Sequence, residues 1–194
     1  MKIDHVIYAA EDLERASARI GDELGLASVQ GGRHEGHGTH NRIVPLGGGY
    51  LELLAVADSA EASGSVIGRA LQARLEDVGE GLFAWAVAVD RIEPVAERLD
   101  LPVTEIARQG LTARLVGVAE ALHHPGLPFF IARDEGVPDP GVGTELGGIS
   151  WVEVACDAEE LQRRLGGERR DVRVVDGNSG VHAMGIGERE FRTA

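Results

Sequence analysis

The sequence predicts an α+β fold in which repeated βαβββ modules form a curved mixed sheet around a concave pocket, with the helices outside. Residues 1–56 read as strand, helix, strand, strand, strand, and residues 81–135 repeat that order. Residues 57–80 read as a helical connector, and residues 146–187 as a partial third module of the type βαββ. With 194 residues and 43% hydrophobic residues, the chain is of a size to form one compact domain.

The first module begins with a strand over Met1–Ala9, which is rich in Ile, Val and Tyr. Residues 12–26 place apolar side chains on one face of a helix, and Gly25 falls near its end. Residues 27–37 read as a strand that runs into a loop rich in Gly and His. The segment HGTHNRIVPLGGGYLELL, residues 37–54, then supplies two strands joined by glycines.

The connector and the second module are predicted from the same kinds of pattern, helical spacing of apolar residues and short apolar strands. Residues 61–77 show the apolar spacing of a helix, 81–89 read as a strand, and 91–99 as a helix. Pro94 is tolerated in that helix because it falls in the first turn. Three further strands are predicted at Thr104–Arg108, Leu111–Val118 and Leu127–Arg133.

An internal repeat supports the modular interpretation. The segment IYAAEDLERASARI aligns without gaps on AVAVDRIEPVAERL, so that Leu13 falls on Ile92 and Arg19 on Arg98. A third copy starts at Ile149 with ISWVEVACDAEELQRRL and supplies strand, helix, strand, strand. No fourth strand is visible from there to the end of the sequence.

Strand alternation gives one carboxylate of the first module a direction. In YLELL, the more uniformly apolar set of side chains should pack on the helix, which turns Glu52 into the trough. In the first strand, the same argument leaves Ile3, His5 and Ile7 facing inward. A His and a Glu on two strands of one small sheet can therefore converge on one point, and a buried carboxylate needs such a partner.

Composition narrows the class of partner and the compartment. The net charge of −13 argues against nucleic acid or an anionic membrane surface as the main partner. The single cysteine, Cys156, cannot close an internal disulfide and fits a reducing compartment. No signal peptide and no apolar run of about 18 residues is visible, so we expect a soluble cytoplasmic protein. The concave face of the predicted fold is where we expect a small-molecule ligand.

The segments IDHVIYAAEDLERA (3–16) and GTHNRIVPLGGGYLELL (38–54) resemble the vicinal-oxygen-chelate superfamily, in particular its glyoxalase-like branch. The resemblance is weaker over 82–134 and faint beyond. It implies that a His in the first strand and a Glu in the fourth strand of a module are ligands of a divalent metal. Carried over to this chain, these metal ligands are His5 and Glu52.

The second module departs from the pattern that the resemblance implies. The repeat puts Ala84 at the place of His5, with Trp85 next to it, and Phe129 or Phe130 at the place of Glu52. None of these can bind a metal, so the ligand set is incomplete, and two ligands are too few for tight binding without helpers. The candidate helpers are His40, His123, His124 and His182.

Other residues are candidates for substrate contact. His40 and Asn41 begin the third strand within the segment that carries the resemblance, and we expect both near a ligand. Trp85, Phe129 and Phe130 either fill the core or form an apolar wall for a hydrophobic ligand. The histidines of GGRHEGHGTH, residues 31–40, favour a solvated loop at the mouth of the pocket over a metal site.

Three alternatives remain open on this basis. The first is a glyoxalase-like enzyme, of the lyase, isomerase or dioxygenase type, with Glu52 and His5 as catalytic residues and a divalent metal of unknown identity. The second is a non-catalytic binding or resistance protein on the same scaffold, which the missing second ligand pair favours. A scaffold that makes only protein contacts is the third alternative. Because edge strands of such modules often pair between chains, a homodimer is the default expectation.

Overall fold

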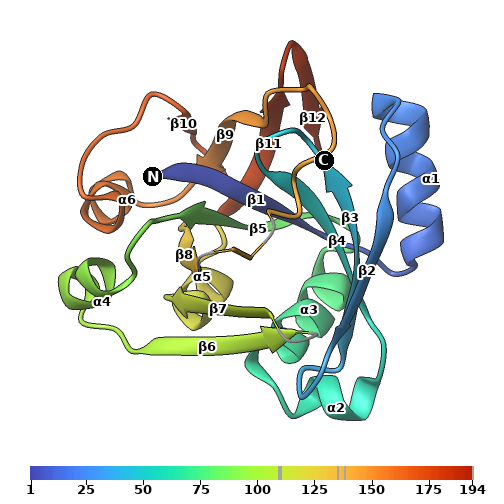
Figure 1. Cartoon of the computed structure of the whole chain (residues 1–194), viewed down its shortest axis with the longest axis horizontal. Coiled ribbons are helices and arrows are strands. Elements are labelled where there is room, and N and C mark those ends of the chain that lie inside the picture. The colour runs from blue at the N-terminus through green and yellow to red at the C-terminus, as the bar shows by residue number, and fades with distance from the viewer. Residues whose placement is uncertain (109–110, 135, 138, 194) are drawn as a thin grey trace.

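The computed structural model describes residues 1–108, 111–134, 136–137 and 139–193. Two sheets dominate it (Figure 1). The strands of the large sheet are β1 (Lys2–Ala9), β2 (Val29–His34), β3 (Thr39–Pro45), β4 (Tyr50–Val56), β5 (Gly81–Ala88), β6 (Val103–Arg108), β7 (Leu111–Val116) and β8 (Phe129–Arg133). The strands of the small sheet are β9 (Ile149–Ala155), β10 (Val172–Val174), β11 (Gly180–Ile186) and β12 (Arg189–Arg192).

The large sheet has eight strands in the order β2-β3-β4-β1-β5-β8-β7-β6. Each half repeats one topology, because the first strand of a module pairs in parallel with its fourth strand, β1 with β4 and β5 with β8. The two modules join where β1 runs antiparallel to β5. The predicted α+β fold, with repeated modules curling one mixed sheet around a concave face, is confirmed.

Helices α1 (Leu13–Leu24) and α4 (Glu93–Leu99) cover the outer face of the sheet (Figure 1). Asp12 accepts a hydrogen bond from the backbone N–H of Arg15 and caps α1, while Gly25 ends it in the left-handed conformation. The four buried side chains of α1 fall at helical spacing and join the core beneath the sheet: Leu13, Ala16, Ile20 and Leu24.

The predicted connector helix is split in two. Helix α2 (Ser59–Ser63) ends at Gly64, and Ser65 then caps α3 (Val66–Asp77) by accepting a hydrogen bond from the Gly68 backbone N–H. Unlike the outer helices, α3 packs on the concave side together with α5 (Val118–His123), a helix that the periodicity did not indicate (Figure 1). These two helices therefore close one end of the trough.

The third module packs its small sheet against the outer face of β1 and β5. Its strand order is β10-β9-β11-β12, and the crossover through α6 (Ala158–Leu165) joins parallel strands β9 and β10. Two expectations are corrected here: Arg189–Arg192 form a further strand that the sequence analysis did not recognise, and the topology differs from that of the first two modules. The third module is therefore a cover for the core rather than another part of the trough.

Candidate functional site

A cavity of about 400 Å³ opens in the concave face between the two modules. Of the described residues that line it, all the polar ones except Arg133 come from the first module. We call this side the polar wall, and it includes His5, His34, His37, Asn41, Tyr50 and Glu52. We call the opposite side, from α3, α5 and the second module, the apolar wall, and it includes Ile67, Phe83, Leu115, Leu122, Phe129 and Ile131.

His5 and Glu52 face each other at the centre of the polar wall. Strands β1 and β4 are neighbours, and their register pairs His5 with Tyr50 and Ile7 with Glu52. Both side chains are buried, and 3.7 Å separate His5 Nε2 from Glu52 Oε2. The convergence that strand alternation predicted is therefore present in the geometry.

A β-bulge brings a second acidic residue to the same place. The β1/β5 register shifts between Ile3 and His5, so the side chains of Asp4 and His5 meet although the two residues are adjacent. Asp4 Oδ2 lies 2.7 Å from His5 Nδ1, which favours the tautomer that donates Nδ1–H to the carboxylate. The bulge also corrects one expectation, because Ile3 packs in the outer core instead of facing the trough.

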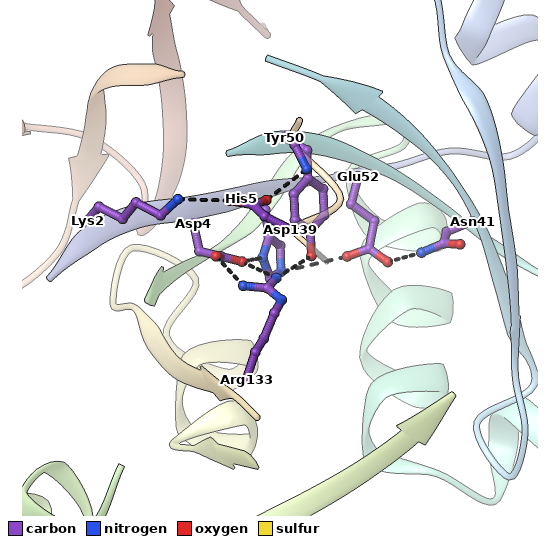
Figure 2. Close-up of polar contacts among 9 residues, drawn as sticks. Lys2, Asp4, His5, Asn41, Tyr50, Glu52, Arg133 and Asp139 are labelled. Atoms are coloured by element: carbon purple, nitrogen blue, oxygen red, sulfur yellow. Dashed lines mark hydrogen bonds and ion pairs between the residues drawn. The ribbon is translucent and has the colours of Figure 1, made fainter. Parts of the chain in front are cut away.

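Arg133 holds Asp4 from the second module. Its two terminal nitrogens donate to Asp4 Oδ1 at 2.6 Å and to Asp4 Oδ2 at 2.7 Å (Figure 2). Burial raises the pKa of Asp4, but the hydrogen bonds from Arg133 and His5 lower it more, and the pKa lies well below its usual range. Arg133, Asp4 and His5 thus form a continuous chain of side-chain contacts that leads to Glu52.

Aromatic rings fix the plane of the His5 ring. Tyr50 stacks on it with centroids 4.7 Å apart, and Phe129 meets it edge-on at 5.4 Å. Burial and the charges of Glu52 and Asp4 raise the pKa of Tyr50 well above its usual value, so its phenol stays neutral. The Tyr50 hydroxyl accepts a hydrogen bond of 3.3 Å from Arg133. With Asp4 on Nδ1 and rings on two sides, His5 presents Nε2 toward Glu52 and the cavity.

Asn41 holds Glu52 from the third strand. The Gly32 backbone N–H donates to Asn41 Oδ1 at 2.8 Å, which fixes the amide so that its nitrogen faces Glu52. That nitrogen donates to Glu52 Oε1 (Figure 2). It also lies 3.3 Å from His34 Nε2. His34 Nε2 therefore accepts, and His34 Nδ1 donates to Thr39 Oγ1 at 3.0 Å.

Four of the seven predicted site residues line the cavity: His5, Asn41, Glu52 and Phe129. His40 does not, because it shares with Arg42 the other face of β3, where Arg42 contacts α1. Trp85 and Phe130 also lie outside it, fully buried in the outer core. For these two residues, the structure supports the alternative that they fill the core.

The register also decides which Phe corresponds to Glu52. With Ala84 at the place of His5, Ala86 corresponds to Ile7, and Ala86 pairs with Phe129 as Ile7 pairs with Glu52. The counterpart is therefore Phe129, on the cavity side. The second module therefore has Ala84 and Phe129 at the positions that His5 and Glu52 occupy in the first module.

Several site residues escaped the sequence analysis, namely Asp4, His34, His37, Tyr50 and Arg133. His34 and His37 stood within a predicted solvated loop, but both line the cavity, and the buried Nδ1 of His37 has no hydrogen-bond partner among the described residues. The one local signal for Asp4 was its position directly before the strand His in IDHV.

The arrangement does not fit a metal ion. Within the described part of the chain, no group of three or more His, Cys, Asp or Glu side chains could hold one. The Asn41 amide nitrogen lies between Glu52 Oε1 and His34 Nε2 and engages both with its hydrogens, so a cation bridging them would have to displace it. The candidate helpers His123 and His124 are exposed and do not line the cavity, and His182 Nε2 lies 2.9 Å from the Asn178 carbonyl oxygen, also outside it.

We therefore expect the purified protein to carry far less than one divalent metal per chain, and dialysis against a chelator to leave its melting temperature unchanged. Elemental analysis and thermal unfolding measure this. One metal per chain that is lost in both His5→Ala and Glu52→Gln, but kept in His40→Ala on the other face of β3, would contradict the conclusion that these side chains do not form a metal site.

The Asp4 pair predicts an acid-sensitive stability. Because the folded-state pKa of Asp4 is depressed, the stabilisation is complete above the unfolded-state value near 3.8 and is lost as the pH falls below it, toward the folded-state pKa. Asp4→Asn removes this carboxylate. The difference in unfolding free energy between wild type and Asp4→Asn should therefore narrow as the pH falls from about 5 to about 3. Urea titrations at both pH values measure it, and a constant difference would contradict the pairing.

The model of a family described as Glyoxalase-like domain matches residues 3–167. No curated protein matches this chain in sequence. In the described part of the chain, no helix is long and apolar enough to cross a membrane.

Solved structures share the fold. A hypothetical protein from Staphylococcus aureus superposes with a TM-score of 0.69 at 19% identity, covering 94% of this chain and 89% of its own. A Streptomyces coelicolor methylmalonyl-CoA epimerase variant in complex with 2-nitronate-propionyl-CoA gives 0.52 at 20% identity, covering 69% and 97%. The Mycobacterium tuberculosis methylmalonyl-CoA epimerase gives 0.52 at 21%, covering 69% and 88%. Because the match to the Staphylococcus aureus protein covers 94% of this chain, it extends beyond the first two modules into the third.

Proposed function

Because this chain belongs to the glyoxalase-like domain family, we propose that it is a small-molecule enzyme that moves a proton at a carbon next to a carbonyl group. Glu52 and His5 are the catalytic pair. The observation that carries the proposal is their position: a carboxylate and an imidazole 3.7 Å apart, buried, on one wall of a largely apolar cavity. General acid–base chemistry needs two such groups within reach of one substrate.

The proposed step needs no metal. The Glu52 carboxylate removes the proton from the carbon, the C–H electron pair forms the enol double bond, and the carbonyl oxygen takes a proton from Nε2 of the His5 imidazolium. Reversal returns a proton to the carbon and regenerates the carbonyl. When the proton on Glu52 is replaced by one from solvent before the return, the carbon exchanges its hydrogen with solvent on the same face.

Residues behind the pair support these roles by holding the reacting atoms. Asp4 on Nδ1 leaves Nε2 of His5 as the nitrogen that meets the substrate, and it stabilises the imidazolium that the step consumes. The Asn41 amide occupies Glu52 Oε1 and leaves Oε2, the oxygen nearer His5, for the proton. Asp4 and Asn41 are positioning residues in this proposal.

The neighbours agree with this type of reaction. Two are named as methylmalonyl-CoA epimerases, and epimerisation inverts one carbon centre. Their identity to this chain is 20% and 21%, so the substrate is not carried over. A lyase or isomerase fits these residues better than a dioxygenase, because Glu52 and His5 are placed to move protons, whereas the Asn41 amide between Glu52 and His34 does not suit a metal site.

A binding protein is the second candidate. It is favoured by the second module, which places Ala84 and Phe129 where the first module has its polar pair. In that case His5 and Glu52 orient a polar group of the ligand and no bond is broken.

Deuterium exchange separates the two functions. The protein is incubated in D₂O with phenylacetone or with methylmalonyl-CoA, and deuterium at the carbon next to the carbonyl is measured by mass spectrometry. An enzyme incorporates deuterium above the buffer rate with at least one compound. Binding of either compound with no exchange beyond that of Glu52→Gln would sink the catalytic proposal and leave the binding protein.

A further inference from the structure

The charge balance of the cavity limits what it can accept. Among the described residues that line it, Arg133 carries the one guanidinium, and both of its terminal nitrogens already donate to Asp4. This pair is neutral as a unit. Glu52 then adds a carboxylate that no guanidinium or ammonium group contacts within the described part of the chain.

The histidines of the polar wall do not reverse this balance. His34 accepts at Nε2 from Asn41 and donates at Nδ1 to Thr39, which is the hydrogen-bonding pattern of a neutral ring. Because Arg133 already matches Asp4, a proton on His5 is matched by Glu52, 3.7 Å from its Nε2, and adds no unmatched cation to the described lining. A ligand with a carboxylate or phosphate near Glu52 would therefore find no unmatched cation among the described lining residues to balance its charge in a poorly solvated site.

The apolar wall supplies most of the remaining contact surface. Phe83, Phe129 and Ile131 come from β5 and β8, and α3 and α5 close the end of the cavity with Ile67 and Leu122. Their side chains cannot satisfy a polar group. Hydrocarbon placed there gains from leaving water, whereas a charged group would lose its hydration without compensation.

We infer that the cavity takes a compact, uncharged molecule whose hydrocarbon body lies on the apolar wall and whose one carbonyl oxygen reaches the His5–Glu52 pair. The inference rests on the proposed function in so far as it uses the same site, and it adds the substrate class. An acyl chain that ends in a charged nucleotide does not meet this description, because its charges would have to lie outside the cavity.

Two probes of the same shape test the charge requirement. Phenylacetone and phenylpyruvate share the benzyl group and the ketone, but the second carries a carboxylate in place of a methyl group. Calorimetry at neutral pH should show phenylacetone binding at least about tenfold tighter, a gap that corresponds to about 1.4 kcal/mol. The gap should shrink in Glu52→Gln, because that variant removes the negative charge of Glu52 and keeps the shape.

A second pair of variants tests the apolar wall. Ile131→Ala should weaken phenylacetone binding several-fold, while Ile149→Ala, on the small sheet outside the cavity, should leave it unchanged. Absent binding of phenylacetone, equal or tighter binding of phenylpyruvate, or equal effects of the two Ile variants would overturn the inference. Selective binding without deuterium exchange would uphold it while the catalytic proposal fails, and exchange with the charged thioester alone would do the reverse.

Discussion

Glu52→Gln should lower the rate of deuterium exchange by about 10²- to 10⁴-fold, the range that a positioned general base contributes. The amide cannot take the proton. The fold should survive, because the Gln side-chain oxygen can still accept the hydrogen bond from Asn41 that Glu52 Oε1 accepts now. The exchange rate and the melting temperature, measured on the same preparation, separate lost chemistry from lost structure.

Glu97→Gln is the matched control, since it makes the same chemical change on the exposed side of α4, far from the cavity. It should exchange deuterium at the wild-type rate. If Glu52→Gln retained more than about a tenth of the wild-type rate, Glu52 would not be the base that the proposal requires.

Arg133→Met should destabilise the protein by about 3–5 kcal/mol, the usual cost of leaving one partner of a buried ion pair alone. Asp4 has no exposed surface, and Arg133 is its bidentate partner. Asp4→Asn together with Arg133→Met removes both charges and should recover a good part of the loss. Urea unfolding of the three variants and the wild type gives the coupling between the two residues.

The surface offers a matched control for this pair. Arg163 also contacts a carboxylate through two nitrogens, those at 2.7 Å from Glu160, but its side chain is 52% exposed. Arg163→Met should change stability little, because water already screens the pair. Equal losses of unfolding free energy in Arg133→Met and Arg163→Met would mean that burial does not determine how much the Asp4–Arg133 pair contributes to stability.

Local patterns were enough to predict the fold class and the convergence of His5 and Glu52 on the cavity. Alternation along YLELL placed Glu52 in the trough, and the resemblance of IDHV and its helix to a known superfamily supplied His5. Asn41 was predicted together with His40 from the segment that carries the resemblance, and Phe129 together with Phe130 from the repeat, and of these four residues Asn41 and Phe129 line the cavity. These predictions depend on regular strands, where neighbouring side chains point to opposite faces.

The missed residues lie where that regularity ends or where the contact is long-range. A bulge turns Asp4 to the side of His5, and another register shift between Gln30 and Arg33 precedes His34. No period of two can reveal either shift. Arg133 contacts Asp4 across 129 positions of sequence. Strand alternation is a local pattern, so it gives no signal for a contact between residues this far apart.

The homodimer stays a prediction.

A crystal structure of the protein with phenylacetone tests the central claim most directly. The claim predicts the ketone oxygen within hydrogen-bond distance of His5 Nε2, the neighbouring methylene carbon against Glu52 Oε2, and the phenyl ring on Phe129 and Ile131. Phenylacetone bound at another surface, with the cavity between the two walls left to solvent, would contradict the claim that the His5–Glu52 pair is the functional centre of this protein.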